Sequence, residues 1–210
     1  PFFQDQPPMI RETSYDEIFD AQRHFRTILD SMSRPGKINH LNSLRLSPPA
    51  GLHKGAAYVA FALFNADVSV HADSLGAEVV EYVRANTASS VAEVAKADYL
   101  IFNGHVDSSV ALIEEAKTGI LAYPETGASA IIQVGHMGKS SATGGLQLTI
   151  EGPGVEVREQ VFVTGLHASL LVSLKGRNTE FPLGIDALLV SADECILCLP
   201  RTARVTWTHL

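Results

Sequence analysis

"AEVVEYVRANTASSVAEVAKADYLIFNG", residues 77–104, sets helical patterns directly before a strand pattern. "AEVVEYVRAN" and "VAEVAKA" predict a helical region that is interrupted near Thr87 to Ser90. Asp98 then leads into "YLIFNG", a short apolar run that is typical of a strand. A helix followed by a strand is the unit from which α/β folds are built.

The same alternation continues on either side of that stretch. Upstream, residues 52–65 are apolar on almost every side, which predicts a central helix, and a short strand is expected at residues 68–70. Downstream, the helix after Ser108 closes at Lys117-Thr118-Gly119, with a cation in its last turn and a glycine after it. The first half of the chain therefore predicts alternating helices and strands.

The second half of the chain is richer in strand patterns. In "LQLTI", Leu146, Leu148 and Ile150 alternate with polar residues, which indicates a strand with one wetter face. Further strands are expected at residues 128–135, 159–166, 185–191 and 195–200, and a helix at residues 167–175. No repeat, linker or low-complexity tract divides the chain. We therefore expect a single α/β domain over residues 1–210, with a mixed sheet between helical layers.

The composition favours a protein with protein partners over one that binds nucleic acid. Hydrophobic residues make up 46% of the chain and charged residues 19%, below the roughly 25% charged fraction of an average soluble domain. We expect part of this apolar surface to be buried against another subunit. The formal net charge of −7 would repel a phosphate backbone. We therefore do not expect the chain to bind nucleic acid.

Membrane and export signals are not expected. The longest apolar stretch, residues 56–66, falls well short of the ~20 residues that a membrane helix needs. The first residues, "PFFQDQPP", carry an acid and prolines where a signal peptide would have a basic and then an apolar region. We therefore expect a cytoplasmic protein without membrane contact.

A helix with clear start and stop signals is predicted near the N-terminus. Ser14 and Glu17 have the spacing of a capping box. The residues expected to face the core recur at helical spacing: Ile18, Ala21, Phe25, Ile28, Leu29 and Met32. Pro35 and Gly36 explain why the helix ends there.

Several motifs suggest chemistry but lack its structural context. "GHMGKSS" contains the Gly-Lys-Ser of a phosphate-binding loop, yet Gln133 replaces the first glycine and a strand follows where a helix is needed. We expect a flexible loop at residues 135–145. Ser129 lacks the G-x-S-x-G frame of a hydrolase nucleophile.

The potential metal ligands are not arranged as a metal site. Cys195 and Cys198 form a C-x-x-C within an apolar run that predicts a buried strand, where positions three apart point to opposite faces. The histidines are scattered singly, and His24 is expected to pack or to cap rather than to bind a metal. We expect neither a metal site nor a cofactor.

Two arginine positions stand beside prolines at the ends of predicted elements. Arg34 ends the first helix, and Arg201, followed by Thr202, ends the last predicted strand. Guanidinium groups suit carboxylates or phosphates. An arginine at a helix end can equally satisfy the last carbonyl groups, so both interpretations remain open.

Five segments in a fixed order resemble one protein family over nearly the whole chain. They are "FRTILDSMSRPGKI" (25–38), "AYPETGASAIIQV" (122–134), "EGPGV" (151–155), "FPLGIDALLV" (181–190) and "LPRTARV" (199–205). Together they resemble the PhnH family, a subunit of the bacterial carbon–phosphorus lyase system for phosphonate use. This chain has Gly127 and Ser129 where a serine and a threonine would be expected, which puts a hydroxyl role at position 127 in question.

The resemblance implies a fold similar to the pyridoxal-phosphate-dependent transferases, in a form without the cofactor. It also implies a homodimer that joins the G, I and J subunits of the lyase complex. That complex is understood to replace the adenine of ATP with a phosphonate, which gives a ribose 1-phosphonate 5-triphosphate. We expect this chain to be a non-catalytic or accessory subunit.

The candidate site residues lie in the resembling segments. Arg34, Glu125, Asp186, Arg201 and Thr202 are expected to form a polar patch that contacts a partner or an anionic ligand. Asp186 and Glu125 can alternatively pair with the arginines.

Two other functions remain open. A free-standing enzyme of the pyridoxal-phosphate type would need a Schiff-base lysine, for which Lys37, Lys139 and Lys175 are candidates. A small-anion binding module would use Arg34 and Arg201.

Overall fold

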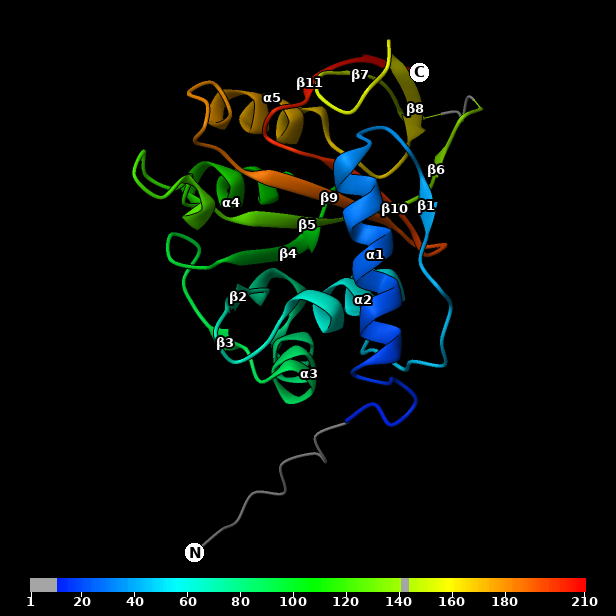
Figure 1. Cartoon of the computed structure of the whole chain (residues 1–210), viewed down its shortest axis with the longest axis vertical. Helices are drawn as coiled ribbons and strands as arrows, with labels where there is room; N and C mark the ends of the chain where they lie inside the picture. Colours follow the sequence, from blue (N-terminus) through cyan, green and yellow to red (C-terminus); the bar gives the residue numbers. More distant parts are fainter. Residues whose placement is uncertain (1–10, 141–143) are drawn as a thin grey trace, which may run out of the picture.

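The computed structural model describes residues 11–140 and 144–210 (Figure 1). The segment "PFFQDQPP", which underlies the expectation of no signal peptide, lies outside these residues. The helices are α1 (Phe19–Ser33), α2 (Lys54–Leu63), α3 (Ala77–Thr87), α4 (Ser109–Glu115) and α5 (Ala168–Arg177), with the short 3-10 helices η1 (Asp73–Leu75) and η2 (Pro124–Thr126). The strands are β1 (Asn39–His40), β2 (Ser69–His71), β3 (Ser90–Val91), β4 (Tyr99–Asn103), β5 (Ser129–Val134), β6 (Met137–Gly138), β7 (Leu146–Glu151), β8 (Glu159–Val163), β9 (Asp186–Ser191), β10 (Cys195–Leu199) and β11 (Arg204–His209).

Within the described residues the strands form two sheets. The larger sheet has seven strands in the order β1-β10-β9-β5-β4-β2-β3. Its strands from β9 to β3 pair in parallel, whereas β10 pairs antiparallel with β9 and β1 antiparallel with β10. The smaller sheet has four antiparallel strands in the order β11-β7-β8-β6. The larger sheet confirms the predicted mixed α/β sheet.

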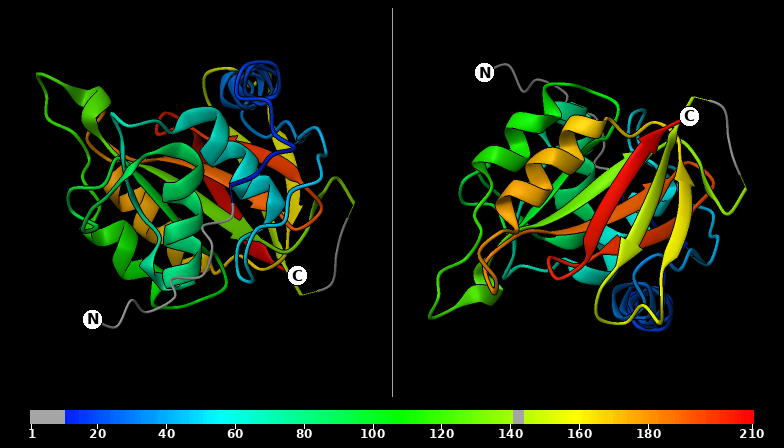
Figure 2. Two further views of the ribbon diagram at one scale, coloured as in Figure 1. Left: turned by 90° about the horizontal axis from the view of Figure 1, so that it is seen from below. Right: turned by 90° about the horizontal axis from the view of Figure 1, so that it is seen from above.

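Alternate residues of the central strands face two different cores. In β4, Ile101 joins the core under α1, α2 and α3, whereas Leu100 and Phe102 face the opposite side. That opposite side is covered by α4, α5 and the smaller sheet (Figure 2). The mixed sheet therefore lies between helical layers as predicted, and the smaller sheet shares one of those layers.

Most predicted strands are confirmed, but the last strand of the structure, β11, was not predicted. In β7, Leu148 and Ile150 are buried and Thr149 is half-buried, which confirms the predicted alternation. β11 follows the predicted "CILCL" strand and pairs with β7 along its length. Its sequence, "RVTWTH", alternates polar and apolar residues and contains the strand-favouring Val205, Thr206 and Trp207, a signal that the prediction overlooked. β6 is a further short strand, within the loop expected at residues 135–145.

The prediction of a helix at "VAEVAKA" is wrong. The amides of Ser90 and Ala92 donate to the carbonyls of Val68 and Val70, which extends the backbone there as the edge strand β3. A turn follows, in which the amide of Ala97 donates to the carbonyl of Glu93. Pairing with β2 thus overrides the local helical pattern.

Helix α1 starts later than predicted and presents a different face. The expected capping box does not form: Ser14 donates to the carbonyl of Arg45, and the carboxylate of Asp16 accepts from the amides of Ile18 and Phe19 instead. The buried face consists of Asp20, His24, Ile28 and Ser31. Ile28 is buried as expected, but Ile18, Phe25 and Leu29 are exposed, which corrects the predicted core stripe.

Buried polar partners explain why α1 is turned this way. His24 stacks on Tyr58 with ring centroids 4.6 Å apart, and its Nε2 lies 3.0 Å from the carbonyl oxygen of Asn42. Asp20 accepts from the amide of Asp16 at 3.0 Å. Because these polar groups find partners inside, an apolar stripe is left outside. The expectation that His24 packs is confirmed.

Helix α2 is the predicted central helix. Residues 56–60 of this helix have no exposed surface, and they pack against both α1 and the mixed sheet. In the part of the chain that the structure describes, no helix combines the length and the apolar character that crossing a bilayer requires.

Asp98 holds the start of β4 to β2. Its carboxylate accepts from the amide and the hydroxyl of Ser69, at 2.8 and 2.7 Å, and pairs with Lys117 Nζ at 2.5 Å. Burial opposes the ionisation of Asp98, but the hydrogen bonds from Lys117 and Ser69 outweigh it. The pKa of Asp98 is therefore lowered from its ordinary value of 3.8.

The lowered pKa predicts how stability depends on pH. The stability that this carboxylate contributes is fully present above pH 3.8 and is lost as the pH falls from there through the lower folded pKa. We expect Asp98→Asn to have a lower urea midpoint than the wild type at neutral pH, and this difference should shrink in acid. Asp67→Asn is the control, since Asp67 is exposed and its side chain makes no described contact. A difference in urea midpoint between Asp98→Asn and the wild type that stays constant across this pH range would contradict the prediction.

Candidate functional site

Arg201 connects three of the segments singled out in the sequence. Its backbone amide donates to Asp186 Oδ1 at 2.7 Å, and its Nη2 and Nε donate to Asp186 Oδ2 at 2.7 and 3.2 Å. Its Nη1 donates to the carbonyls of Pro124, at 2.8 Å, and Pro182, at 3.4 Å. The side chains of Arg201 and Asp186 are only 13% and 22% exposed. The guanidinium therefore joins η2, the loop before β9 and the loop after β10.

Two glycines let these segments approach one another. A Cβ on Gly127 would lie 2.6 Å from the carbonyl oxygen of Gly184, and a Cβ on Gly184 would overlap the side chain of Asn178. Real Cβ atoms do not come so close to backbone atoms, so the segments around residues 124–127 and 182–186 can meet only through glycine. Gly127, where a serine was expected, therefore has a packing role.

A second junction joins the end of α1 to the "EGPG" turn. A Cβ on Gly154 would overlap the carbonyl oxygen of Ser33, and a Cβ on Gly152 would lie 3.1 Å from the carbonyl oxygen of Thr202. The turn thus lies between the end of α1 and the loop that carries Arg201. Residues that are far apart in the sequence meet here.

The candidate residues are only partly brought together. Asp186, Arg201 and Thr202 are adjacent, and Glu125 is exposed in η2, next to the carbonyl of Pro124 that Arg201 binds. Arg34 lies at the end of α1, beyond the "EGPG" turn, where it pairs with Asp30. The alternative in which Asp186 pairs with an arginine is the one that this geometry favours, whereas Glu125 makes no ion pair among the described residues.

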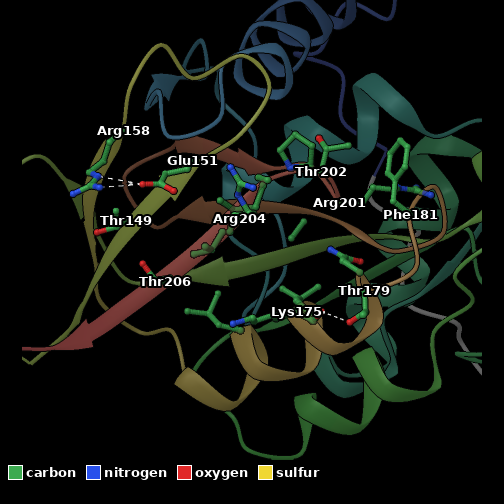
Figure 3. Close-up of a pocket in the computed structure, with 18 residues that line it drawn as sticks. Thr149, Glu151, Arg158, Lys175, Thr179, Phe181, Arg201, Thr202, Arg204 and Thr206 are labelled. Atoms are coloured by element: carbon green, nitrogen blue, oxygen red, sulfur yellow. Dashed lines mark hydrogen bonds and ion pairs between the residues drawn. The ribbon is translucent and has the colours of Figure 1, made fainter.

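A cavity of about 900 Å³ opens beside Arg201 and Thr202 (Figure 3). Helix α5 and strand β11 lie on two of its sides, the loops after α5 and β10 supply much of the rest, and β7, Arg158, Ala187 and Leu199 complete the lining. The apolar side chains on its surface include Leu171, Leu174 and Leu199. The cavity is therefore an amphipathic pocket at the junction of the large and small sheets.

The charges that line this cavity are mostly positive. The cations are Arg158, Lys175, Arg201 and Arg204, and the acid is Glu151. Arg158 pairs with Glu151 at 3.2 Å, and Arg201 pairs with Asp186. Within the described chain, the ammonium of Lys175 and the guanidinium of Arg204 make no hydrogen bond or ion pair. Two unpaired cations therefore remain at the cavity.

Arg158 and Arg204 were not among the site residues expected from the sequence. Arg204, Thr206 and Thr208 alternate with Val205 and Trp207, so a polar face would have been visible had β11 been recognised as a strand. Arg158 lies just before β8 and had no sequence signal.

The three lysine candidates for a Schiff base with pyridoxal phosphate do not lie in surroundings that suit this cofactor. Lys37 pairs with Asp30 at 2.7 Å, and Lys139 pairs with Glu159. Lys175 lines the cavity, but a pyridoxal ring also needs an acid or an arginine beside its nitrogen and a lysine enclosed with it. Arg204 could stand beside the ring nitrogen, but Lys175 is exposed and is therefore not enclosed with a ring. The residues around Lys175 do not fit that cofactor.

The cysteines are not a reactive pair. Cys198 is buried on the side of α1 and α2, whereas Cys195 packs on the opposite side, which confirms the prediction from their spacing. Burial raises the pKa of both thiols, so both are protonated at neutral pH. Among the described residues, no three His, Cys, Asp or Glu side chains are grouped so that they could hold a metal ion.

Comparison with known proteins decides the family. The sequence pattern of the bacterial phosphonate metabolism protein PhnH matches residues 13–206. The chain belongs to the PhnH family. It is 28% identical over 192 residues to the alpha-D-ribose 1-methylphosphonate 5-triphosphate synthase subunit PhnH of Rhizobium meliloti (strain 1021), which covers 90% of this chain and 92% of that protein. It is also 28% identical over 185 residues to the putative C-P lyase subunit protein HtxG of Stutzerimonas stutzeri, with 88% of this chain and 85% of that protein covered. The resemblance to the PhnH family is thus confirmed.

Proposed function

We propose that this PhnH family member is an accessory subunit of a carbon–phosphorus lyase complex in the cytoplasm. In this role it supports the transfer of a phosphonate to the ribose of ATP, which gives a ribose 1-phosphonate 5-triphosphate. Its partners are a second copy of the chain and the G, I and J subunits. The two relatives, a ribose 1-methylphosphonate 5-triphosphate synthase subunit and a putative C-P lyase subunit, support this proposal.

The observation that carries the proposal is the uncovered apolar face of α1. Ile18, Phe19, Phe25 and Leu29 are 72%, 66%, 47% and 55% exposed. Ile18, Phe25 and Leu29 are seven and four residues apart, so they lie in one stripe along the helix. Grouped apolar side chains on the surface of a soluble protein mark interaction sites. The stripe therefore supports docking of α1 onto another subunit.

The candidate residues fit an accessory role. Arg201 and Asp186 bind each other and the surrounding backbone, so they hold loops in place. Cys195 and Cys198 are protonated and offer no thiolate nucleophile. We further propose that the mixed sheet and its helices are related to the fold of the pyridoxal-phosphate-dependent transferases, without the cofactor.

Co-purification tests the proposed assembly. We expect the chain, expressed with its G, I and J partners, to purify as one complex, and Leu29→Glu to abolish this association. The free energy of unfolding of the isolated variant should change by no more than about 0.5 kcal/mol, because Leu29 is largely exposed.

Val172→Glu is the matched control. Val172 is also an exposed apolar residue on a helix, with 58% exposure, but it lies on α5. The control should leave the complex intact. A Leu29→Glu variant that co-purifies normally would refute the α1 interface, and turnover of ATP with methylphosphonate by the isolated chain would refute the accessory role.

A further inference from the structure

We infer that the cavity between α5 and β11 is a binding site for an organic phosphate or phosphonate about as large as a nucleoside monophosphate. This inference goes beyond the proposed assembly role, because it concerns a different surface and needs no partner subunit. It rests on the charge of the cavity, its size and its lining.

Charge is the first support. The chain has a formal net charge of −7, yet cations outnumber acids at this cavity. After the pairs Arg158–Glu151 and Arg201–Asp186 are formed, Lys175 and Arg204 still have no carboxylate partner in the described chain. They come from α5 and from the start of β11, on different walls of the cavity (Figure 3). An anion bound there would gain charge-assisted hydrogen bonds from both walls.

Hydroxyl groups extend this polar surface. Thr149, Thr202 and Thr206 line the cavity, and their hydroxyls make no hydrogen bond within the described chain. A hydroxyl donates readily to a phosphate oxygen and also accepts from a sugar hydroxyl. Arginine, lysine and threonine side chains together are a donor set that suits a phosphate or phosphonate group.

The size and the apolar lining of the cavity indicate that the ligand has an uncharged organic part as well as a charged group. The volume of about 900 Å³ lies within the range of roughly 300–1,000 Å³ for small-molecule sites and far exceeds what a bare phosphate fills. Phe181 offers a largely exposed ring to a ligand, whereas Leu171, Leu174 and Leu199 line the cavity with little exposed surface. An apolar or planar group packs well against such a surface.

Calorimetric titration of the isolated full-length chain tests the site with three matched probes. AMP carries both a phosphate and a nucleoside, adenosine lacks the phosphate, and inorganic phosphate lacks the nucleoside. We expect AMP to bind at least about tenfold more tightly than either of the other two, since each part contributes its own contacts. Equal binding of AMP and adenosine, or no binding of AMP at millimolar concentration, would overturn the inference.

Substitutions test whether the binding occurs in this cavity. Lys175→Met and Arg204→Gln should each weaken AMP binding about tenfold, because each removes a charged hydrogen-bond donor. Lys175→Arg should retain most of the affinity. Lys96→Met removes a cation that lies outside the cavity, in the turn before β4, and should have no effect. Unchanged AMP affinity in both charge-removing variants would place the ligand elsewhere and refute the assignment.

Two further measurements keep the test decisive. Thermal unfolding of the ligand-free variants should match the wild type, because Lys175 and Arg204 are exposed and their charged groups have no partner in the part of the chain that the structure describes. If a variant does not fold, the salt dependence of AMP binding to the wild type takes its place, since screening weakens binding that depends on charge. Binding that is insensitive to salt would contradict the inference. Because these titrations use the chain alone, they can fail while co-purification succeeds, and the reverse.

Discussion

Asp186→Asn should lower the free energy of unfolding by about 3 kcal/mol, because it leaves the largely buried guanidinium of Arg201 without its counter-charge. In a chain of this size, that corresponds to a fall of about 6–12 °C in the unfolding temperature. The hydrogen bonds from Arg201 to Pro124 and Pro182 should weaken as well, since the carboxylate holds the guanidinium in place. Urea unfolding of the wild type and the variant measures the difference.

Two comparison variants separate this effect from a general loss of charge. Glu93→Gln removes the acid from the exposed pair with Lys96 and should cost less than about 0.5 kcal/mol. Arg201→Lys keeps the charge but loses the planar fork that binds Asp186 and two carbonyls, and should cost about 2 kcal/mol. If Asp186→Asn proved no more harmful than Glu93→Gln, the proposed role of Arg201 in holding the loops together would be wrong.

Gly154→Ala is the other substitution with a large expected effect. Gly154 has φ of +82°, and a Cβ there would overlap the carbonyl oxygen of Ser33 and lie 3.1 Å from Pro35 Cδ. Left-handed backbone alone costs a non-glycine residue about 1–2 kcal/mol. The overlap must in addition push the "EGPG" turn away from the end of α1. We therefore expect a total loss of about 3–5 kcal/mol in the free energy of unfolding.

Gly144→Ala is the control for this prediction. Gly144 has nearly the same φ, +80°, but a Cβ there would meet no atom of the described residues within 4 Å. Gly144→Ala should lower the free energy of unfolding only by the cost of the left-handed backbone, about 1–2 kcal/mol. The gap between the two alanine variants in chemical denaturation then measures the contact with Ser33. Equal losses would show that the turn does not depend on close packing against α1.

Where local pattern and tertiary environment agree, the sequence is a reliable guide. The alternation of Leu146, Leu148 and Ile150 predicts which face of β7 is buried, because strand periodicity is a property of the backbone. The same property places Cys195 and Cys198 on opposite faces of β10. The apolar run at residues 52–65 predicts α2 because a helix that is apolar all round must be buried.

Where a segment depends on distant partners, the local pattern is misleading. Residues 91–97 have a helical pattern, yet pairing with β2 and a turn use their backbone groups. Helix α1 has the expected period, but His24 and Asp20 find buried polar partners and thereby turn Phe25 and Leu29 outward. Strand β11 differs from these two segments, since its alternating pattern agrees with its pairing along β7.

The candidate site shows the same division. Segments around Arg34, Glu125, Asp186 and Arg201 could be chosen from the sequence, because their order and chemistry resemble one family. The sequence could not predict which of these segments meet, and it could not predict the cavity that Lys175 and Arg204 both line. The pairing of Arg201 with Asp186 spans 15 residues and its bond to Pro124 spans 77, so only the docking of loops brings these groups together.

By itself, the sequence determined the α/β class, most helices and strands and membership of the PhnH family, because these follow from backbone periodicity and from residue types in a fixed order. The tertiary structure alone decided which face of α1 is left uncovered, which arginines are neutralised and where two cations remain that have no partner among the described residues. Those outcomes depend on distances between residues far apart in the chain, and sheet pairing and glycine-mediated loop contacts set these distances.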